Sequence, residues 1–322
     1  MTLSIIIVAW NSRKDLPECL ESIRQNPFGG DCEVLVVDNG SSDDTAEVVR
    51  RGFPEVRLIA NEKNSGFAAA NNQGITEAQG DYLLLLNPDT VVHAGALDGM
   101  VGFLAAHEDV GVVGPLLLNT DGTIQPSTRR FPDFRSALYH STIFRSLGLF
   151  RGHYRQYMMR HFKPDQPTDV DQVMGAAFMT RRSVVDRIGV LDERFFMYYE
   201  EVDFCYRVKQ AGWRVVILPD MRITHHGGAS SAQVPVAARM MVLTSLIQYL
   251  RKHRGSLATA LFNSLFKPGV LLRHAAEIAT AIPTLLLARI LSNNGMRQKA
   301  VRRLRSSAHF LGRYSGRLLF RT

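Results

Sequence analysis

The sequence predicts an α/β protein whose mostly parallel, doubly wound sheet is flanked by helices, followed by a helical, basic, amphipathic tail. Strand and helix patterns alternate through roughly the first hundred residues, as in successive βα units. The first strand, Leu3–Ala9, is continuously apolar, which is typical of a strand buried on both faces. From Arg251 to Thr322 the chain carries 14 Lys and Arg but one acid, whereas the preceding 250 residues carry 24 bases and 29 acids.

The expected elements follow one another in βα order. Strands are predicted at Leu3–Ala9, Glu33–Val37, Val56–Ala60 and Asp81–Leu86, and helices at Asp15–Gln25, Asp43–Arg51 and Phe67–Ala78. The second helix has a clear start signal, because serines and acids precede and open it. In such a sheet, ligands bind beyond the carboxyl ends of the strands. The polar residues at those ends are Trp10, Asn11, Asp38, Asn39, Asn87 and Asp89.

The second half of the chain is less regular. It predicts a strand at Val112–Leu118, a loop near Gln125–Pro132, an apolar segment at Val173–Thr180, a helix at Glu200–Gln210, a strand at Trp213–Leu218, and mostly helices beyond Val236. With 322 residues, 46% hydrophobic and 21% charged, the chain has an ordinary globular composition. We expect a main domain at 1–250 and a helical region at 251–322.

Cysteine use and apolar runs bear on the compartment. The three cysteines have no metal-ligand spacing, which favours a reducing cytosol. The N-terminus has no basic segment before its short apolar run, so it is interpreted as a strand rather than a signal peptide. We expect no stretch of about 20 uninterrupted apolar residues, the length of a membrane-spanning helix. The best candidate, Ala275–Leu291, contains charged residues and a proline.

Two carboxylates are expected directly after strands. Asp38, in VVDNGSSDDT, can accept hydrogen bonds from a base N–H or from ribose hydroxyls; the alternative is a plain turn with a helix cap. Asp89, in LLLLNPDT, follows Pro88 and can bind a hard divalent cation that bridges phosphate oxygens. The alternative there is an Asn-Pro turn that closes the strand.

Two later segments carry ionisable side chains. In FFMYYEEVDFCYR, Glu200 and Glu201 follow bulky aromatic residues, and partial desolvation would raise a carboxyl pKa toward the range of a general base. Asp203 is expected to pair with Arg207 at i,i+4. In ITHHGGAS, His225 can ligate a metal or donate to a diphosphate; the alternative is a solvated pair of histidines in a loop.

Together these segments resemble, in order and spacing, the family-2 glycosyltransferases of GT-A fold, particularly the bacterial rhamnosyltransferase-like branch. The matching segments are SIIIVAWNS, VVDNGSSDDT, NSGFAAANNQG, LLLLNPDT, GAAFMTRR, FFMYYEEVDFCYR and HHGGAS. The resemblance covers roughly the first 255 residues, and the combination is specific although no single segment is.

The resemblance implies a Rossmann-like domain that binds a UDP- or dTDP-sugar. Asp89 and His225 would hold Mg²⁺ or Mn²⁺, and the acidic pair would supply the catalytic base. Two positions depart from the family pattern: Asn87 stands where the metal motif often has an aspartate, and Glu200-Glu201 replaces the usual Glu-Asp. The base position then falls on Glu201, ahead of Glu200. The residues that would bind the nucleotide sugar are Ala9, Trp10, Asn11, Asp38, Asn39, Asn64, Gly66, Asn87 and Asp89.

The tail favours contact with a membrane surface. In Lys299–Arg313 one predicted helical stripe contains Val301, Leu304, Ala308 and Leu311, and Phe310 does not join it. Because a basic amphipathic helix lies naturally in an anionic interface, we expect a cytoplasmic protein, peripheral on the inner face of the cell membrane. The alternative is that the apolar face packs on the enzyme or on a second subunit, giving a homo-oligomer. Nucleic acid is not expected as a partner, since the basic stretch lacks a recognised binding motif.

The leading hypothesis is therefore a metal-dependent, inverting glycosyltransferase of cell-surface polysaccharide synthesis. It would move L-rhamnose from a dTDP- or UDP-sugar to a hydroxyl of a lipid-linked or growing glycan. One rival is a sugar nucleotidyltransferase, which usually needs a Gly-rich basic loop after the first strand, and AWNSRKD lacks the glycines. The other rival is a non-catalytic, membrane-associated scaffold that keeps the fold.

Overall fold

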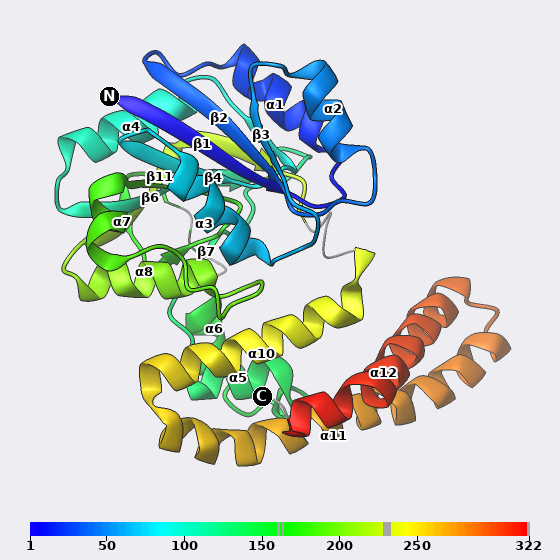
Figure 1. Cartoon of the computed structure of the whole chain (residues 1–322). Helices are drawn as coiled ribbons and strands as arrows, with labels where there is room; N and C mark the ends of the chain where they lie inside the picture. Colours follow the sequence, from blue (N-terminus) through cyan, green and yellow to red (C-terminus); the bar gives the residue numbers. More distant parts are fainter. Residues whose placement is uncertain (160–161, 163, 228–232, 321–322) are drawn as a thin grey trace. The chain divides into compact units, whose positions relative to one another are not determined.

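The computed structural model describes residues 1–159, 162, 164–227 and 233–320 (Figure 1). The described residues form two compact units: unit 1 is Met1–Phe131 with Met158–Gln233, and unit 2 is Pro132–Tyr157 with Val234–Thr322. The predicted division into a main domain at 1–250 and a helical region at 251–322 remains a prediction. The compact units divide the chain elsewhere, because helix α10 (Pro235–Arg254) groups with the later helices.

Within the described residues, unit 1 contains a mixed sheet of nine strands. These are β1 (Thr2–Ala9), β2 (Asp31–Asp38), β3 (Arg57–Ala60), β4 (Tyr82–Leu86), β5 (Thr90–Val92), β6 (Val110–Leu118), β8 (Thr168–Asp169), β10 (Ala177–Arg181) and β11 (Arg214–His225). Their order is β3-β2-β1-β4-β10-β6-β11-β5, and β8 pairs with β11. β1 to β4 are parallel, whereas β10 runs antiparallel between β4 and β6. The predicted mostly parallel α/β architecture is confirmed.

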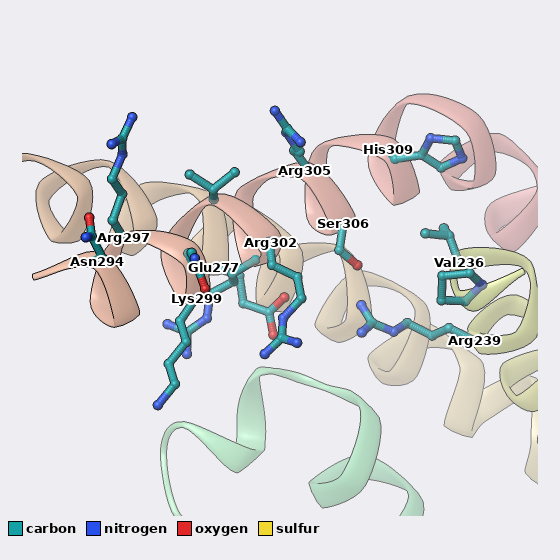
Figure 2. Close-up of a pocket in the computed structure, with 14 residues that line it drawn as sticks. Val236, Arg239, Glu277, Asn294, Arg297, Lys299, Arg302, Arg305, Ser306 and His309 are labelled. Atoms are coloured by element: carbon teal, nitrogen blue, oxygen red, sulfur yellow. The ribbon is translucent and has the colours of Figure 1, made fainter. Parts of the chain in front are cut away.

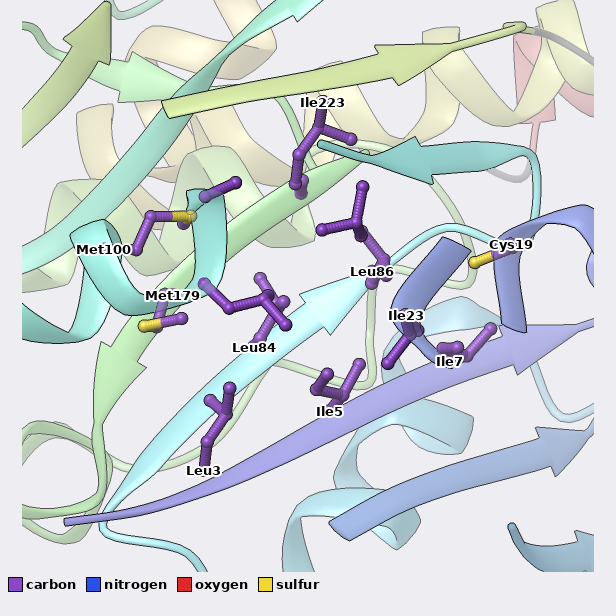
Figure 3. Close-up of a cluster of buried hydrophobic side chains, with 14 of the residues drawn as sticks. Leu3, Ile5, Ile7, Cys19, Ile23, Leu84, Leu86, Met100, Met179 and Ile223 are labelled. Carbon is purple, nitrogen blue, oxygen red and sulfur yellow. The ribbon is translucent and has the colours of Figure 1, made fainter. Parts of the chain in front are cut away.

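Helices cover both faces of this sheet (Figure 1). One face packs on α1 (Leu16–Gln25), α2 (Thr45–Gly52) and α4 (Ala96–Ala106), and the other on α3 (Phe67–Glu77), α7 (Arg182–Ile188) and α8 (Glu200–Gln210). Along β1, Leu3, Ile5 and Ile7 pack toward the first set, with Cys19 and Met100 (Figure 3), while Ile6 packs toward the second. Each such buried side chain contributes about 1.5–3 kcal/mol, which explains why β1 is apolar from Ile5 to Ala9.

The elements predicted for the first ninety residues are confirmed at nearly the same bounds, and α8 begins and ends at the predicted residues. Two later expectations are wrong in extent. Val173–Thr180 is divided between β9 (Gln172–Val173), which pairs with β7 (Thr128–Arg129), and β10. The strand predicted to end at Leu218 continues to His225, because a register shift between Leu218 and Arg222 accommodates Pro219. His225 therefore lies in a strand and not in a loop.

Unit 2 is helical in its described part. Its elements are α5 (Phe134–Ser141), the 3₁₀ helix η1 (Ile143–Arg145), α6 (Arg151–Met158), α10, α11 (Ser256–Ile290) and α12 (Asn294–Phe320). α11 and α12 form a long hairpin held by a buried polar cluster: Ser307 donates to Glu277 at 2.6 Å, and His274 lies 3.0 Å from the Ser307 hydroxyl. Phe310 stacks on His274 with ring centroids 4.2 Å apart.

The predicted apolar stripe of α12 is wrong in position. Ala308 is exposed, and the other three members are only half-buried. The buried side instead contains Ala300, Ser307, Phe310, Tyr314 and Leu318. The cause is the polar cluster, because α12 meets α11 along Ser307 and Phe310, and an apolar pattern does not register a hydroxyl that is satisfied by a partner helix.

α11 contains most of the segment Ala275–Leu291, in which we expected no stretch of about 20 uninterrupted apolar residues, and a proline and charged residues do interrupt it. By length and composition alone, this 35-residue helix is long and apolar enough to cross a membrane, and 17% of its most apolar window is buried. Pro268 and Pro283 lie inside it without ending it. Its exposed apolar side chains include Leu261, Leu265, Leu272, Ile282, Leu286 and Ile290. One such helix is weak support for a span, since a core or interfacial helix has the same composition.

Asn72 fastens α3 to the segment before α8. Its side-chain Nδ2 donates to the Leu191 carbonyl at 2.8 Å and to Glu193 at 2.9 Å, and its Oδ1 accepts from the Leu191 N–H at 3.0 Å. The side chain is buried, so the amide satisfies backbone groups that water does not reach freely.

We expect Asn72→Ala to lower the free energy of unfolding by about 2–3 kcal/mol, because it leaves a buried N–H and C=O of Leu191 unpaired. Gln73→Ala on the same helix is the control, since Gln73 exchanges hydrogen bonds only with the half-buried Asn61 side chain. We expect it to cost less than about 0.5 kcal/mol. Urea denaturation measures both, and equal losses would contradict the assignment.

Candidate functional site

The ends of β1 and β2 lie side by side, because Ala9 pairs with Asp38 in the parallel register. Ser41 joins the loops that follow. Its N–H and hydroxyl both donate to Asp38 Oδ1, and its hydroxyl accepts from the Asn11 N–H at 2.8 Å. Asn11 Oδ1 in turn accepts from the Ser42 N–H at 2.8 Å. No described residue hydrogen-bonds to Asp38 Oδ2, so Ser41 orients the carboxylate through one oxygen and leaves the other without a protein partner in the described part of the chain.

Trp10 and Asn11 occupy the turn after β1. Both are half-buried, and Asn11 has φ 49°, the left-handed region that asparagine tolerates. Asn11 also exchanges hydrogen bonds with Gln233, donating from Nδ2 at 3.3 Å and accepting at its carbonyl at 3.2 Å. The turn is thus held on two sides, by Ser41-Ser42 and by Gln233.

The side chains of Asn39 and Asn64 hydrogen-bond to each other. The buried Asn39 amide donates to Asn64 Oδ1 and to the Gly66 carbonyl, both at 3.1 Å, and its Oδ1 accepts from the Ser65 N–H at 3.0 Å. These bonds use the side chain fully. The Asn39 side chain therefore holds the Asn64–Gly66 loop in place and has no hydrogen-bonding group left for direct contact with a donor.

Gly66 brings this loop against the segment before α8. Its φ is 96°, and a Cβ added there would lie 2.6 Å from the Phe196 carbonyl oxygen. The next residue, Phe67, donates its N–H to that same oxygen at 2.7 Å. Only glycine allows so close an approach, so the Asn64–Gly66 loop is held directly against the segment that precedes the acidic pair.

Asp89 and His225 face each other at the same edge of the sheet. His225 pairs with Thr90 where β11 meets β5, and its Nε2 lies 3.4 Å from Asp89 Oδ1. On the other side of the ring, Nδ1 lies 2.8 Å from Gln125 Oε1. Both Asp89 and His225 are buried.

Gln125 decides which nitrogen of His225 carries the proton. Its Nε2 donates to Asn119 Oδ1 at 3.0 Å and to the His225 carbonyl at 3.1 Å, so Oε1 must be the atom that faces the ring. An amide oxygen only accepts, so Nδ1 must donate. In the neutral ring, Nε2 then presents a lone pair beside the Asp89 carboxylate.

This donor set fits a divalent cation. A neutral imidazole and a carboxylate that face each other need a proton or a metal between them, and a histidine ligand normally donates its other N–H to an oxygen, as His225 does to Gln125. The described residues contain no cluster of three or more His, Cys, Asp or Glu able to hold a metal. Two protein ligands leave the remaining positions to water and phosphate oxygens, the arrangement usual for magnesium.

Glu200 and Glu201 form a buried acidic pair at the start of α8. The Oε2 atoms of both are buried without a hydrogen-bond partner in the described part of the chain. Burial, followed by repulsion from Glu201, raises the pKa of Glu200 well above its ordinary value. Burial also raises the pKa of Glu201, although backbone hydrogen bonds and the nearby Arg129 oppose the rise. The expected desolvation of this pair is confirmed.

The backbone ahead of the pair is strained. Tyr198 and Tyr199 have φ of 69° and 71°, a region that bulky residues rarely adopt, and Tyr199 caps α8 directly before Glu200. Two consecutive outliers beside two buried carboxylates indicate a segment shaped for a site rather than for stability. Asp203, by contrast, pairs with Arg207 at 2.8 Å, as predicted from their spacing.

Backbone contacts join the acidic pair to the Asp89 side. Asn87 donates its N–H to the Ala176 carbonyl at 2.8 Å. The neighbouring Gly175 lies against Glu201, since a Cβ added there would meet the Glu201 carboxyl carbon at 3.6 Å. Asp38, Asp89, His225 and the acidic pair therefore lie along one edge of the sheet, as the strand-end rule predicts.

Part of one predicted segment lies outside the described residues, and two residues near the site had no motif that predicted them. Gly228, Ala229 and Ser230 of the HHGGAS segment lie outside the described residues. Nothing in the sequence pattern singled out Gln125, because a lone glutamine in a loop carries no periodicity or motif. Arg129 likewise belongs to no motif that would predict a place near the acidic pair.

Comparison with known proteins gives a consistent result. The family model for glycosyl transferase family 2 matches residues 4–189. The N-acetylglucosaminyl-diphospho-decaprenol L-rhamnosyltransferase of Mycobacterium tuberculosis is 30% identical over 217 residues, covering 63% of this chain and 69% of that protein. The low-salt glycan biosynthesis hexosyltransferase Agl10 of Haloferax volcanii is 31% identical over 214 residues, 65% of this chain and 62% of that protein.

Among solved structures, the mannosyltransferase PcManGT of Pyrobaculum calidifontis, in complex with GDP-Man and Mn²⁺, matches with a TM-score of 0.55. The match covers 96% of this chain and 86% of that one, at 18% sequence identity. At that identity the likeness concerns the fold, which is the GT-A fold.

We expect Glu200→Gln to stabilise the protein increasingly as the pH rises above about 4.5. The folded state raises the pKa of Glu200, so wild type loses stability as the pH climbs from the ordinary value through the raised one, and the neutral amide does not. The gain should reach about 1.4 kcal/mol per unit of pKa shift. Urea denaturation from pH 4 to 8 measures it, and a difference that does not change with pH would contradict the assignment.

Proposed function

This chain belongs to glycosyl transferase family 2, and we propose that it is an inverting, metal-dependent enzyme that transfers a sugar from a nucleotide diphosphate donor to a hydroxyl acceptor. Membership makes it a glycosyltransferase with the GT-A fold. Its relatives place it among enzymes of cell-surface glycan synthesis. Inversion, the metal, the donor and the acceptor are proposals.

The observation that carries the proposal is the buried acidic pair at the sheet edge that also holds Asp89 and His225. A buried carboxylate oxygen without a hydrogen-bond partner costs stability, and each of these two adjacent side chains has one such oxygen in the described part of the chain, as expected where chemistry requires it. The raised pKa values bring these groups toward the range in which a carboxylate accepts a proton efficiently.

In the proposed mechanism Glu201 is the general base. It accepts the proton of the acceptor hydroxyl while that oxygen attacks the anomeric carbon, and the bond from this carbon to the diphosphate oxygen breaks. A single displacement inverts the configuration. Glu200 is the more deeply buried, and Glu201 raises its pKa, so we assign it the neutral form, which spares the site a second charge.

Asp89 and His225 would hold Mg²⁺ or Mn²⁺, and the ion would stabilise charge on the departing nucleoside diphosphate. Gln125 would keep the His225 lone pair turned toward the ion. Asn87, in the position of a first motif aspartate, adds no charge, so ligation by the protein is weaker than in a two-aspartate motif.

For the donor, Asp38 Oδ2 would accept from the base or ribose of a dTDP- or UDP-sugar, beside Ala9, Trp10 and Asn11. Gly66, Asn39 and Asn64 would shape the loop over it. L-Rhamnose is the leading sugar, because the relative with that specificity is 30% identical. The same relative acts on a diphospho-decaprenol, which supports a lipid-linked acceptor here.

The composition of the C-terminal helices supports the proposal that the enzyme acts at the inner face of the cell membrane. α11 exposes leucines and isoleucines along its length, and α12 is basic. Self-association through this apolar face, giving a homo-oligomer, is the alternative. The nucleotidyltransferase is disfavoured by family membership, and turnover measurements decide between the enzyme and a scaffold.

We expect Glu201→Gln to lower kcat about 10²–10⁴-fold, because a neutral amide cannot accept the proton. Thermal stabilisation by dTDP- or UDP-sugar with Mn²⁺ should persist, since donor contacts lie on other loops. Glu201→Asp, which restores the pairing usual in the family, is the control and should retain activity within about tenfold. Unchanged turnover in Glu201→Gln would exclude the assigned base.

We expect Gln125→Leu to weaken Mn²⁺ binding about 10–100-fold, because Nδ1 of His225 loses the acceptor that orients it. Gln125→Glu keeps an acceptor and should recover most of the affinity. Calorimetric titration of Mn²⁺ in the presence of a nucleoside diphosphate measures both. Equal affinity in all three proteins would remove His225 from the metal site.

A further inference from the structure

Unit 2 contains a cavity of about 1030 Å³ lined by residues of α10, α11 and α12 (Figure 2). The lining is strongly basic. Figure 2 shows Arg239 of α10 and Arg302 of α12 extending into the lined space, with Glu277 of α11 nearby. The cations of the lining are Arg239, Arg297, Lys299, Arg302, Arg303 and Arg305.

The positive charge of this cavity exceeds its negative charge, six cations to one acid. Within the described residues, none of the six cations lies within ion-pair distance of a carboxylate. Glu277, the acid in the lining, is committed elsewhere: it pairs with Arg273 at 3.1 Å and accepts from Ser307 at 2.6 Å. Burial opposes ionisation of Glu277, but hydrogen bonds from His274 and Ser307 prevail and hold its pKa well below the usual range. It remains ionised and its charge acts on Arg239, so one acid stands against the six cations of the lining.

Arg239, Lys299 and Arg302 extend toward one side of α12, whereas Arg297 and Arg305 extend toward the other (Figure 2). Like charges so close together repel one another, and a multivalent anion would relieve that repulsion. Arginine forks match phosphate oxygens in geometry as well as in charge, and five of the six cations are arginines. The cavity therefore favours clustered phosphate oxygens over a single carboxylate.

The apolar surface next to the cavity indicates where such phosphates come from. Ile290 and Leu291 at the end of α11 are exposed, and the chain enters the cavity lining three residues later at Asn294. Leu286 and Leu287, one turn earlier, are exposed as well. A soluble polyanion would leave this apolar surface in water, whereas a lipid offers an acyl or prenyl chain together with its phosphate.

We propose that this basic cavity is a binding site for the head group of a membrane lipid that carries a phosphomonoester or diphosphate, with the apolar end of α11 against the lipid chains. The proposal specifies how the protein would associate with the membrane. It rests on the proposed function only in that the protein is placed at a membrane surface. It goes further than general attraction to an anionic surface, because it assigns recognition to one set of side chains.

The test measures binding of the full chain to vesicles of phosphatidylcholine alone, with phosphatidylglycerol, or with phosphatidic acid or farnesyl diphosphate at matched surface charge. Arg239→Gln/Arg302→Gln removes two cavity charges. Arg254→Gln/Arg313→Gln is the matched control, since it removes one arginine from each of the same two helices outside the lining.

We expect wild type to prefer the phosphomonoester and diphosphate vesicles. The cavity variant should lose about 30-fold in affinity for them, equivalent to about 2 kcal/mol for two basic residues at a lipid surface. The control should lose less than about threefold. Arg302→Lys, which keeps the charge but not the fork, should fall between wild type and the cavity variant.

Three outcomes would overturn the proposal: equal losses in both double variants, no loss in the cavity variant, or binding of inorganic pyrophosphate in solution as tight as binding to the vesicles. The last outcome would assign the site to a soluble phosphate. The readout involves no sugar transfer, and donor stabilisation is measured on the same proteins. Lipid binding without donor binding would therefore reject the proposed function alone, and the reverse result would reject this site alone.

Discussion

The site depends on one constraint, which is that both faces of the sheet in unit 1 are buried under helices. A polar side chain on either face costs several kcal/mol unless it is hydrogen-bonded, so the buried strand residues are mostly apolar and the candidate ionisable groups lie where strands end. Ser4 and Thr180, which are buried and polar, are both hydrogen-bonded. Asp38 ends β2, Asp89 follows β4, and His225 ends β11. The helices that stabilise the fold thereby bring the candidate site residues to its edge.

Two features along that edge lower stability. In the described part of the chain two carboxylate oxygens are buried without partners, and two consecutive tyrosines before them adopt left-handed backbone angles. Both features cost free energy and neither contributes to the core. Surrounding contacts hold them in place: Gly66 docks on the Phe196 carbonyl, and Gly175 lies against Glu201. At the proposed metal site, the Gln125 side chain accepts from His225 Nδ1 and so fixes the tautomer of the ring.

Unit 2 differs from unit 1 because a polar cluster is buried between its helices while apolar side chains are exposed. Its helices join through a small polar cluster of His274, Glu277 and Ser307, and it leaves both leucines and arginines outside. A surface of that composition is poorly suited to water alone. It is suited to an interface where apolar chains and phosphates occur together, which is why the charge on the tail and the apolar length of α11 belong to one explanation.

The sequence by itself determined the strands and helices of the first ninety residues and the bounds of α8, and it predicted candidate site residues that lie at one edge of the sheet. Those features are local: periodicity, turn residues and strand-end positions are encoded by neighbours in the chain. Tertiary structure alone decided that β11 runs on to His225, that Gln125 orients that histidine, that Glu200 is the more deeply buried acid, and that α12 buries Ser307 and Phe310. Each of these depends on a partner distant in sequence, and a hydrogen bond or a burial between distant segments leaves no periodic trace in either one.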